Sequence, residues 1–515
     1  MSSLRKDGGA TPPPFGRVLV ANRGEIAVRI IRACRELGVG SVAVYSDADA
    51  AAMHVMLADR AEHIGDVAPA ASYLNTEALL EAARRSGAEA IHPGYGFVSE
   101  NADFARAVEA AGLVFIGPPP ATLEALGNKL AARRSAVAAR IPVVPGLTVA
   151  LDGDPADPAI LRQLVDVGFP AMLKAAAGGG GRGMRRVDGP DDLPDALAAA
   201  RREAASAFGD GTVYVERLVS PARHVEVQLL GDRHGGLVAL GERDCSVQRR
   251  HQKLVEESPS PAVTPEIREA MQDSARRVAR TVDFHNAATV EFLLAADGSH
   301  YFLEMNTRLQ VEHGVTELVT GLDIVAWQLR IAAGEALPQA VLETPARGHA
   351  IEVRLYAEDP WDEFRPVAGD VGAWRMPEGP GVRVDTAIFG ATALPSQYDP
   401  LLAKILVWGT DRPAALGRLR RALDETVIGG VQTDLGFLRW LVDEPGFATG
   451  AYDTSLIPDR WGRGPELASA DAALVAAAAI EGRRSAATPR SAAPASPRSG
   501  DSAWSRLARR EAVEP

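Results

Sequence analysis

The sequence predicts an α/β protein of several domains, in which the first domain contains a parallel sheet flanked by helices and the last is α+β. At 515 residues the chain is too long for one hydrophobic core. Near the N-terminus, short apolar runs alternate with segments whose apolar residues follow helical spacing, which is typical of a parallel sheet. Further along the chain, several runs alternate polar and apolar residues with the period of a β-strand.

The composition excludes several classes of protein. Hydrophobic residues make up 46% of the chain and charged residues 24%, as in globular proteins, and no apolar run is long enough to span a bilayer. A net charge of −12 argues against nucleic-acid binding. The N-terminus lacks the apolar core of a secretory signal, and Cys34 and Cys245 are too few for a disulfide framework. We therefore expect a cytoplasmic protein without membrane or nucleic-acid partners.

The first elements follow a strand–helix order. Strands are expected at residues 17–23, 41–49, 88–97 and 113–120. The segment 24–38 has helical spacing and ends in Gly38. This opening resembles a Rossmann sheet, but it lacks the GxGxxG fingerprint, so dinucleotide binding is not supported. The polar, glycine-rich tip at 92–101 stands where such a sheet binds its ligand. A longer helical stretch is expected at 121–140.

Residues 168–187 are expected to form a strand, a glycine-rich loop and a second strand. Four consecutive glycines are costly in chain entropy, so a function should require them. One interpretation is a flap whose backbone N–H groups close over phosphates, with Lys174 reaching them from the strand. The alternative, a flexible surface hairpin, is equally compatible with this feature alone. The loop is not a Walker A motif, because no Lys-Ser or Lys-Thr follows the glycines.

Three further strands are expected between the glycine loop and residue 257. The segment 213–219 could present backbone groups to a base, and 223–230 alternates as a half-buried strand should. The charged stretch 242–257 contains Gln248, His251 and Lys253. If this stretch is extended, His251 and Lys253 point the same way. A solvated edge strand is the alternative.

The segment 291–312 predicts a hairpin around Asp297-Gly298, a dipeptide typical of a two-residue turn. Such a turn places Glu291 directly opposite Glu304. Two like charges at facing positions destabilise a sheet, and a hard cation between the carboxylates would remove that penalty. The sequence therefore predicts a Mg²⁺ site, with a solvated sheet face as the alternative.

Polar residues continue beyond this pair at every second position, in the order Asn306, Arg308, Gln310 and Glu312. While the chain stays extended, this period places them on the same face as Glu304. After them, an alternating strand at 346–360 contains Arg354. Further β-like runs at 381–386 and 404–409 and an amphipathic helix at 411–426 predict a compact α+β domain.

Taken together, these motifs resemble the biotin carboxylase family of the ATP-grasp superfamily. The matching stretches occur in family order over residues 17–458: ANRGEIAVRIIRAC, IHPGYGFVSEN, GNK, GGGGRGM, RHVEVQ, ERDCSVQRRHQK, EMNTRLQVEH and GHAIEVRLYAEDP. Gly314 departs from the family pattern, because it replaces a common proline. The resemblance implies a Rossmann-like N-terminal domain (15–125), an ATP-grasp domain (126–345) with a mobile lid (about 146–218) and a C-terminal domain (346–459). The composition on either side predicts a disordered leader (1–14) and a partly disordered Ala/Ser/Pro/Arg-rich tail (460–515).

The resemblance also implies a role for each matching side chain. ATP would be bound by Lys129, Lys174, Gly179, Gly180, Glu216, Arg217, Val219, His224, Gln248, His251, Glu291 and Glu304. Mg²⁺ or Mn²⁺ would be held by Glu291, Glu304 and Asn306. Bicarbonate would be bound by Lys253, Arg308, Gln310, Val311 and Glu312, with Glu312 as general base. Biotin would be bound by Arg354 and Tyr95, with Glu100 beside them, and Arg354 would stabilise the ureido oxygen.

The implied reaction is ATP- and bicarbonate-dependent carboxylation of biotin through carboxyphosphate, the first half-reaction of an acyl-CoA carboxylase. Acetyl-CoA is favoured as the final acceptor, with propionyl-CoA open. No lysine follows Lys404, so the tail cannot carry biotin, and we expect a separate biotin carboxyl carrier protein besides a carboxyltransferase. A homodimer is expected, because Arg32 and Glu36 match interface positions of the family.

Two other functions stay open. One is a different ATP-grasp ligase that makes another acyl phosphate; it would share the ATP residues but would not need Arg354. The other is a nucleotide-binding protein without catalytic activity. The presence of Lys253, Arg308, Glu312 and Arg354 argues against that second alternative.

Overall fold

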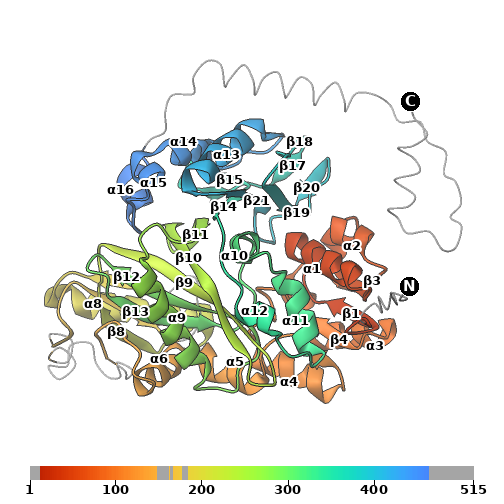
Figure 1. Cartoon of the computed structure of the whole chain (residues 1–515), viewed down its shortest axis with the longest axis horizontal. Helices are drawn as coiled ribbons and strands as arrows, with labels where there is room; N and C mark the ends of the chain where they lie inside the picture. The colour runs from red at the N-terminus through yellow and green to blue at the C-terminus, as the bar shows by residue number, and fades with distance from the viewer. Residues whose placement is uncertain (1–11, 148–161, 163–165, 177–183, 463–515) are drawn as a thin grey trace, which may run out of the picture.

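The computed structural model describes residues 12–147, 162, 166–176 and 184–462. Three parts follow one another along the chain, from the N-terminal part in red and orange through the central part in yellow and green to the C-terminal part in blue (Figure 1). The predicted ATP-binding residues Gly179 and Gly180, the leader up to residue 11 and the tail from residue 463 lie outside the described residues.

The N-terminal part contains a five-stranded parallel sheet with the order β3-β2-β1-β4-β5. Its strands are β1 (Arg17–Val20), β2 (Gly40–Ser46), β3 (Arg60–Gly65), β4 (Ala90–His92) and β5 (Val114–Phe115). Helices alternate with them: α1 (Gly24–Glu36), α2 (Met53–Leu57), α3 (Thr76–Ser86) and α4 (Ala102–Ala110). The predicted parallel sheet is confirmed.

The expected long helix at 121–140 is in fact two helices, α5 (Pro120–Gly127) and α6 (Lys129–Ala138). The break lies at Asn128, whose side chain accepts a hydrogen bond of 3.0 Å from the backbone N–H of Ala131. Asparagine is favoured at the first position of a helix for this reason. The periodicity of the apolar residues alone does not show such a break.

A small three-stranded antiparallel sheet, which we call the lid sheet, follows. It consists of β6 (Ala171–Ala175), β7 (Arg185–Val187) and β8 (Val213–Arg217) in the order β7-β6-β8, and α8 (Leu193–Phe208) packs on it. Leu173, Val215 and Leu197 belong to its buried hydrophobic cluster. The predicted strands on both sides of the glycine loop are confirmed.

The central sheet has eight strands in the order β13-β12-β9-β10-β11-β14-β21-β19, and all neighbours are antiparallel. The strands are β9 (Ala222–Gly231), β10 (Leu237–Arg249), β11 (Gln252–Ser258), β12 (Asn286–Ala295), β13 (His300–Asn306), β14 (His349–Tyr356), β19 (Val382–Thr386) and β21 (Leu401–Gly409). The stretch 242–257 therefore lies in two interior strands, not at a solvated edge.

The prediction that β9 is half-buried is wrong, because all ten of its residues are buried. Val225 and Val227 pack in a hydrophobic cluster with Met271 of α9 (Pro265–Ala279). Glu226, at an alternate position, lies on the other side of the sheet, where it pairs with Arg243 and Lys253. Alternation of polar and apolar residues therefore reflects two buried environments here, and not one buried face and one solvated face.

The hairpin between β12 and β13 differs from its prediction in one respect. Ala295 pairs with Ser299, so the loop has three residues, 296–298, with Gly298 at a φ of 84°. The predicted two-residue turn is therefore wrong. A shift of register between Glu291 and Phe292 compensates for the longer loop, and Glu291 faces Glu304 as predicted. A bulge in one strand restores the original alignment after such a loop.

The chain does not stay extended as far as Glu312. β13 ends at Asn306, the next residues form a loop, and helix α10 (His313–Thr320) begins directly after Glu312. The imidazole Nδ1 of His313 lies 2.8 Å from the carbonyl of Gln310 and supports this turn into the helix. Helices α11 (Ile324–Ala332) and α12 (Gln339–Leu342) follow. The prediction of a continuous strand face is therefore wrong, although its side chains still converge, as described below.

The C-terminal part extends the central sheet with β14, β21 and β19 and covers it with helices. These are α13 (Arg412–Glu425), α14 (Leu435–Asp443), α15 (Pro445–Thr449) and α16 (Leu456–Arg460), and short strands form the pairs β15 (Glu358–Asp359) with β16 (Arg365–Pro366), β17 (Gly369–Val371) with β20 (Thr392–Leu394), and β18 (Ala373–Arg375) with β22 (Val427–Gly429). The predicted α+β domain and its amphipathic helix are confirmed.

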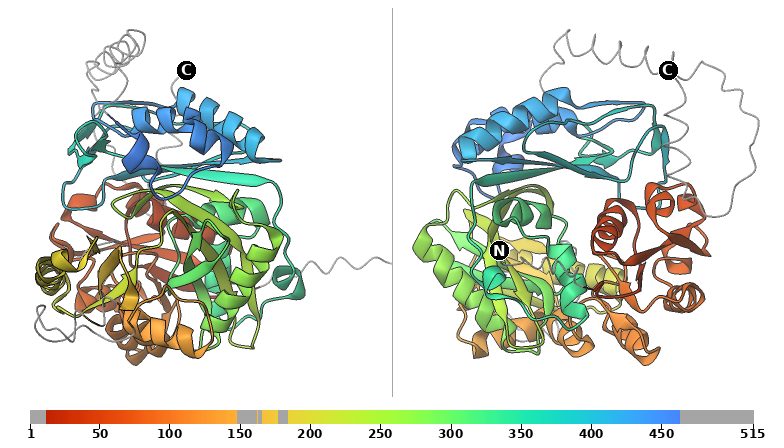
Figure 2. Two further views of the ribbon diagram at one scale, coloured as in Figure 1. Left: turned by 90° about the vertical axis from the view of Figure 1, so that its left-hand side faces the viewer. Right: turned by 45° about the vertical axis from the view of Figure 1, so that its right-hand side comes forward.

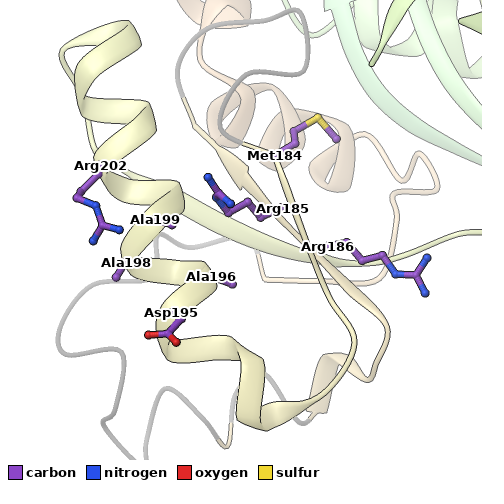
Figure 3. Close-up of a pocket in the computed structure, with 8 residues that line it drawn as sticks. All are labelled: Met184, Arg185, Arg186, Asp195, Ala196, Ala198, Ala199 and Arg202. Carbon is purple, nitrogen blue, oxygen red and sulfur yellow. The ribbon is translucent and has the colours of Figure 1, made fainter. Parts of the chain in front are cut away.

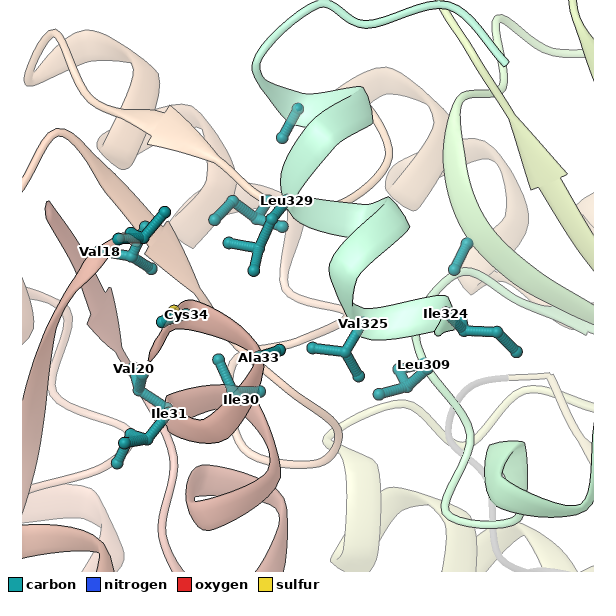
Figure 4. Close-up of a cluster of buried hydrophobic side chains, with 14 of the residues drawn as sticks. Val18, Val20, Ile30, Ile31, Ala33, Cys34, Leu309, Ile324, Val325 and Leu329 are labelled. Carbon is teal, nitrogen blue, oxygen red and sulfur yellow. The ribbon is translucent and has the colours of Figure 1, made fainter. Parts of the chain in front are cut away.

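The parts pack closely against one another (Figure 2). Ile30 and Ala33 of α1 belong to the same hydrophobic cluster as Val325 and Leu329 of α11 (Figure 4). This contact joins the N-terminal part to the segment that connects β13 and β14 of the central sheet. Within the described residues, no helix is long and apolar enough to cross a membrane.

Candidate active site

The centre of the candidate site is the ammonium group of Lys253 on β11. Its Nζ lies 2.6 Å from a carboxylate oxygen of Glu226, 2.8 Å from one of Glu291 and 2.7 Å from one of Glu312. Burial alone would lower the pKa of Lys253, but these carboxylates, Glu226 foremost, raise it well above its ordinary value. Lys253 is therefore a permanent cation that organises three acidic side chains from different segments.

Sequence reasoning did not find two members of this cluster, Arg243 and Glu226. Arg243 is completely buried, and its guanidinium donates to Glu226 at 2.5 Å and to Thr316 at 2.9 Å. Glu226 pairs with Glu291 across β9 and β12. The argument about facing like charges could have found Glu226 if the register between those strands had been predicted, because Glu226, Glu291 and Glu304 lie side by side on three adjacent strands.

The pair predicted to hold a metal ion lies next to this cluster. Glu291 contacts His224 Nε2 at 2.8 Å and accepts a hydrogen bond of 2.9 Å from the amide of Asn306. Burial would raise the pKa of Glu291, but Lys253 and His224 hold it far below its ordinary value. Carboxylate and amide oxygens are the ligands that a hard divalent cation prefers, so the donor set of Glu291, Glu304 and Asn306 fits Mg²⁺.

The loop from Asn306 to Glu312 brings together the predicted bicarbonate ligands. The guanidinium of Arg308 donates to the side-chain oxygens of Gln310 at 2.9 Å and of Asn306 at 3.2 Å, and it pairs with Glu100 at 3.0 Å. Gln310 in turn donates to Glu291 at 3.3 Å. The predicted grouping of these side chains with Lys253 is therefore present in space, although a loop and not a strand produces it.

Glu312 lies between two of the cations with predicted catalytic roles, Lys253 and Arg354. One of its oxygens is 2.7 Å from Lys253 Nζ, and the other is 2.9 Å from the guanidinium of Arg354. Burial would raise its pKa, but Lys253 and Arg354 lower it well below the ordinary value. Arg354 also contacts Glu256 at 2.5 Å, a residue that sequence reasoning missed, and burial raises the pKa of Glu256 to about 7.

The predicted biotin residue Tyr95 lies in the N-terminal part. Its hydroxyl donates a hydrogen bond to the carboxylate of Glu25. Burial, followed by the charge of Glu25, raises the pKa of Tyr95 well above its ordinary value, so the side chain is a neutral phenol.

On the nucleotide side, the lid sheet and α6 meet at Glu216 of β8. Lys174 Nζ of β6 and a guanidinium nitrogen of Arg133 each lie 2.5 Å from its carboxylate. Lys129 at the start of α6 lies 2.8 Å from Glu304. The lysines predicted to contact ATP are thus held by acidic side chains between the lid sheet and the central sheet.

The remaining predicted nucleotide residues differ in their exposure. Gln248 on β10 is buried, whereas Arg217 at the end of β8 and His251 are exposed and Val219 is half-buried. The predicted common direction of His251 and Lys253 requires both residues to lie in an extended strand, and His251 does not. It lies at the tight turn between β10 and β11, where its φ is 67°.

A separate cavity of about 630 Å³ lies between β7 and α8 (Figure 3). It is lined by Met184, Arg185, Arg186, Asp195, Ala196, Ala198, Ala199 and Arg202, and none of the predicted site residues is among them. Two of the three arginines are paired with acids, Arg185 with Glu203 and Arg186 with Asp188. This hollow is therefore distinct from the cluster around Lys253.

Comparison with known proteins decides the family. Family models match residues 14–123 (biotin carboxylase, N-terminal domain), 128–340 (carbamoyl-phosphate synthase L chain, ATP binding domain) and 352–459 (biotin carboxylase C-terminal domain). The chain is 48% identical over 455 residues to the biotin carboxylase of Halalkalibacterium halodurans, covering 88% of this chain and 100% of that one. The chain belongs to the biotin carboxylase family. The predicted resemblance, fold class and enzyme class, an ATP-dependent ligase, are therefore confirmed.

Other members of the biotin carboxylase family resemble the chain equally well. A pyruvate carboxylase subunit of Methanothermobacter thermautotrophicus is 46% identical over 451 residues, which cover 87% of this chain and 91% of that one. The biotin carboxylase domain dimer of Hydrogenobacter thermophilus 2-oxoglutarate carboxylase, solved with MgADP, ADP and bicarbonate, superposes with a TM-score of 0.83. It is 43% identical, and the match covers 86% of this chain and 97% of that one. These relatives are named for different final acceptors.

Proposed function

We propose that this chain uses ATP and bicarbonate to carboxylate biotin through carboxyphosphate. The observation that carries the proposal is the position of Glu312, whose two carboxylate oxygens contact Lys253 and Arg354. One acidic side chain thus touches both the cation proposed for bicarbonate and the cation proposed for biotin. A different ATP-grasp ligase has no need for that second contact.

ATP binds between the lid sheet and the central sheet. Its proposed contacts are Lys129, Lys174, Gly179, Gly180, Glu216, Arg217, Val219, His224, Gln248 and His251. Glu291, Glu304 and Asn306 would hold Mg²⁺ or Mn²⁺, and such a cation, when bound, neutralises charge on the transferring phosphoryl group. What supports this arrangement is that the acidic pair faces the lysine at the start of α6, with Lys129 2.8 Å from Glu304.

Bicarbonate is a poor nucleophile, so its activation requires a base and fixed cations. Lys253 and Arg308 hold the anion, with Gln310 and the backbone of Val311 beside it, and Glu312 accepts its proton. The pKa of Glu312 is low because Lys253 and Arg354 bind it, which keeps it ionised. When bicarbonate takes over contacts of Lys253, the carboxylate loses part of that stabilisation and becomes a stronger base. The oxygen of bicarbonate then attacks the γ-phosphorus and ADP leaves.

Carboxyphosphate breaks down to CO₂ and phosphate, and the phosphate takes the N1 proton of biotin. N1 then attacks CO₂ and forms carboxybiotin. Arg354, with Tyr95 as a further biotin contact, stabilises the negative charge that develops on the ureido oxygen. The side chain of Arg354 is only 8% exposed, so water screens its charge little, which strengthens this effect.

We propose a separate carrier protein and a carboxyltransferase, with acetyl-CoA as the final acceptor and fatty acid synthesis as the process served. We also propose a homodimer through the face of α1 on which Arg32 and Glu36 are exposed. A cytoplasmic location agrees with the free, buried thiols of Cys34 and Cys245.

The test is ATP hydrolysis by the purified chain with and without bicarbonate and free biotin. The proposal requires hydrolysis that depends on bicarbonate and increases with biotin, together with formation of carboxybiotin from labelled bicarbonate. ATP hydrolysis that depends on bicarbonate but is not stimulated by biotin would identify a different ATP-grasp ligase. Nucleotide binding without turnover would identify a protein without catalytic activity. Addition of carrier and carboxyltransferase with acetyl-CoA or propionyl-CoA would then identify the acceptor.

A further inference from the structure

Lys404 of β21 is completely buried, which is rare for a lysine and requires compensation of its charge. It is one of five lysines in a chain whose Lys and Arg total 55. Its Nζ donates a hydrogen bond of 2.8 Å to the backbone carbonyl of Val311 and lies 3.1 Å from a carboxylate oxygen of Glu25. Nothing in the proposed reaction uses this ammonium directly.

The groups around Lys404 come from three parts of the chain. Glu25 lies in the first turn of α1 in the N-terminal part, Val311 lies in the loop that precedes α10, and Lys404 itself belongs to the C-terminal part. Lys404 also pairs directly with Arg354 across β14 and β21. Lys404 is therefore adjacent to two of the proposed catalytic groups. It pairs with Arg354 on the sheet, and its ammonium binds the peptide that joins Val311 to Glu312.

The carboxylate that acts most strongly on Lys404 is Glu25, followed by Glu352 and Asp385. Asp385 on the neighbouring strand is 3.7 Å from Nζ, but Arg383 already donates two hydrogen bonds to it, of 2.9 Å and 2.7 Å. The other oxygen of Glu25, Oε2, is buried and has no hydrogen-bond partner among the described residues. Loss of Lys404 would thus leave Glu25 without its principal cation.

Glu25 links this ammonium to the proposed biotin pocket. The carboxylate oxygen that faces Lys404, Oε1, also accepts the hydrogen bond from the hydroxyl of Tyr95. A continuous series of contacts therefore runs from Tyr95 through Glu25 and Lys404 to the carbonyl of Val311. Because a peptide group is planar, a fixed Val311 carbonyl also fixes the backbone N–H of Glu312.

We propose that Lys404 is a positioning residue for carboxylation: it fixes the peptide between Val311 and Glu312 at the bicarbonate site and ties that peptide to Tyr95 at the biotin pocket. The inference rests on the proposed function. A purely structural role predicts a different result. An ion pair that only stabilises the fold would change stability without a specific effect on the KM for bicarbonate.

The test compares three variants of the full chain. Lys404→Met removes the ammonium, and Glu25→Gln/Lys404→Met also removes the charge of Glu25, so that this carboxylate is not left without its cation. Arg268→Met is the control, because it breaks a different ion pair of 2.7 Å with the buried Glu242. Folding is checked by circular dichroism. The KM for bicarbonate and the Kd for ATP are then measured.

We expect the KM for bicarbonate to rise about tenfold or more in both Lys404 variants, while the Kd for ATP stays within about threefold of the wild type. The Arg268→Met control should leave both values unchanged. A folded double variant with an unchanged KM for bicarbonate would overturn the inference, even if Lys404→Met alone does not fold.

A measurement that does not depend on enzymatic turnover, hydrogen exchange, separates this inference from the proposed function. Hydrogen exchange at the backbone amides of residues 309–313 should be faster in the folded Lys404 variants than in the wild type and the control, because the Val311 carbonyl is released. If the wild type lacks bicarbonate-dependent hydrolysis, the proposed function fails on its own. Unchanged exchange at these amides would refute the positioning role whatever the activity.

Discussion

Glu291 and Glu304 face each other across β12 and β13, and different cations neutralise them. The ammonium of Lys253 contacts Glu291, which also contacts the imidazole of His224, whereas the ammonium of Lys129 contacts Glu304. Facing like charges are unfavourable in a sheet, so these cations allow the pair to persist before any ligand binds. Glu304 is 26% exposed and Glu291 only 7%, so Glu304 is the more accessible oxygen donor.

Glu304→Gln should weaken the use of the divalent cation. The amide keeps the shape of the side chain but loses the charge that a hard cation prefers, so we expect the Mg²⁺ concentration for half-maximal ATP hydrolysis to rise about tenfold. A Mg²⁺ titration at saturating ATP measures it. Glu109→Gln, at an exposed position of α4, is the matched control. An unchanged Mg²⁺ titration in Glu304→Gln would remove Glu304 from the metal site.

Glu312→Gln should abolish most biotin carboxylation while nucleotide binding persists. The amide cannot accept the proton of bicarbonate, and loss of a general base costs about 10²–10⁴-fold. Carboxybiotin formation is measured with labelled bicarbonate, and ATP affinity by calorimetry. Wild-type turnover in this variant would disprove the role of Glu312 as the base.

Gly314→Ala should destabilise the protein through one contact. A Cβ at this position would lie 2.3 Å from Cδ2 of Leu406, which is fully buried. Overpacking of a core costs about 1–3 kcal/mol, more than alanine gains over glycine in a helix. Leu406→Ala should compensate in the double variant, and thermal unfolding of the single and double variants measures the coupling. Additive effects of the two substitutions would contradict the proposed clash.

Glu257 should contribute to the loss of stability in acid. Burial raises its pKa, but His349 and Arg412 lower it from 4.5 to about 2. Because the pKa is lower in the folded state, the stabilisation is complete above pH 4.5 and is lost as the pH falls toward 2; it amounts to about 3 kcal/mol.

Urea unfolding between pH 6 and pH 3 tests this contribution. The stability difference between wild type and Glu257→Gln should be constant above pH 5 and shrink below it, whereas Glu109→Gln should follow the wild type throughout. A difference that does not change with pH would show that Glu257 is not the titrating group.

The facing pair of glutamates was predictable, although one step of its derivation was wrong. The two-residue turn fails because Ala296 joins Asp297 and Gly298 in the loop, yet the bulge near Glu291 cancels the error. A bulge depends on how neighbouring strands and α9 pack, which local sequence does not contain. The loop after Asn306 was also missed. Its polar and apolar residues alternate as those of a strand do, so the local sequence does not show that the strand ends there.

The cations and acids that complete the site were harder to predict. Arg243, Glu226 and Glu256 lie on alternating strands that could equally belong to a solvated sheet face. Their burial follows from the register of β9, β10 and β11 with distant strands. Lys253 was identified by its motif, but its contacts with three carboxylates depend on segments up to 59 residues away.

The ladder between β11 and β14 crosses a boundary between two family models, which end at residue 340 and begin at residue 352. Two regions that separate family models match therefore share one continuous sheet. If the polypeptide were divided between the two matched regions, β11 and β14 would each become an exposed edge strand that can pair with other chains. We expect the two fragments to precipitate unless they are synthesised together.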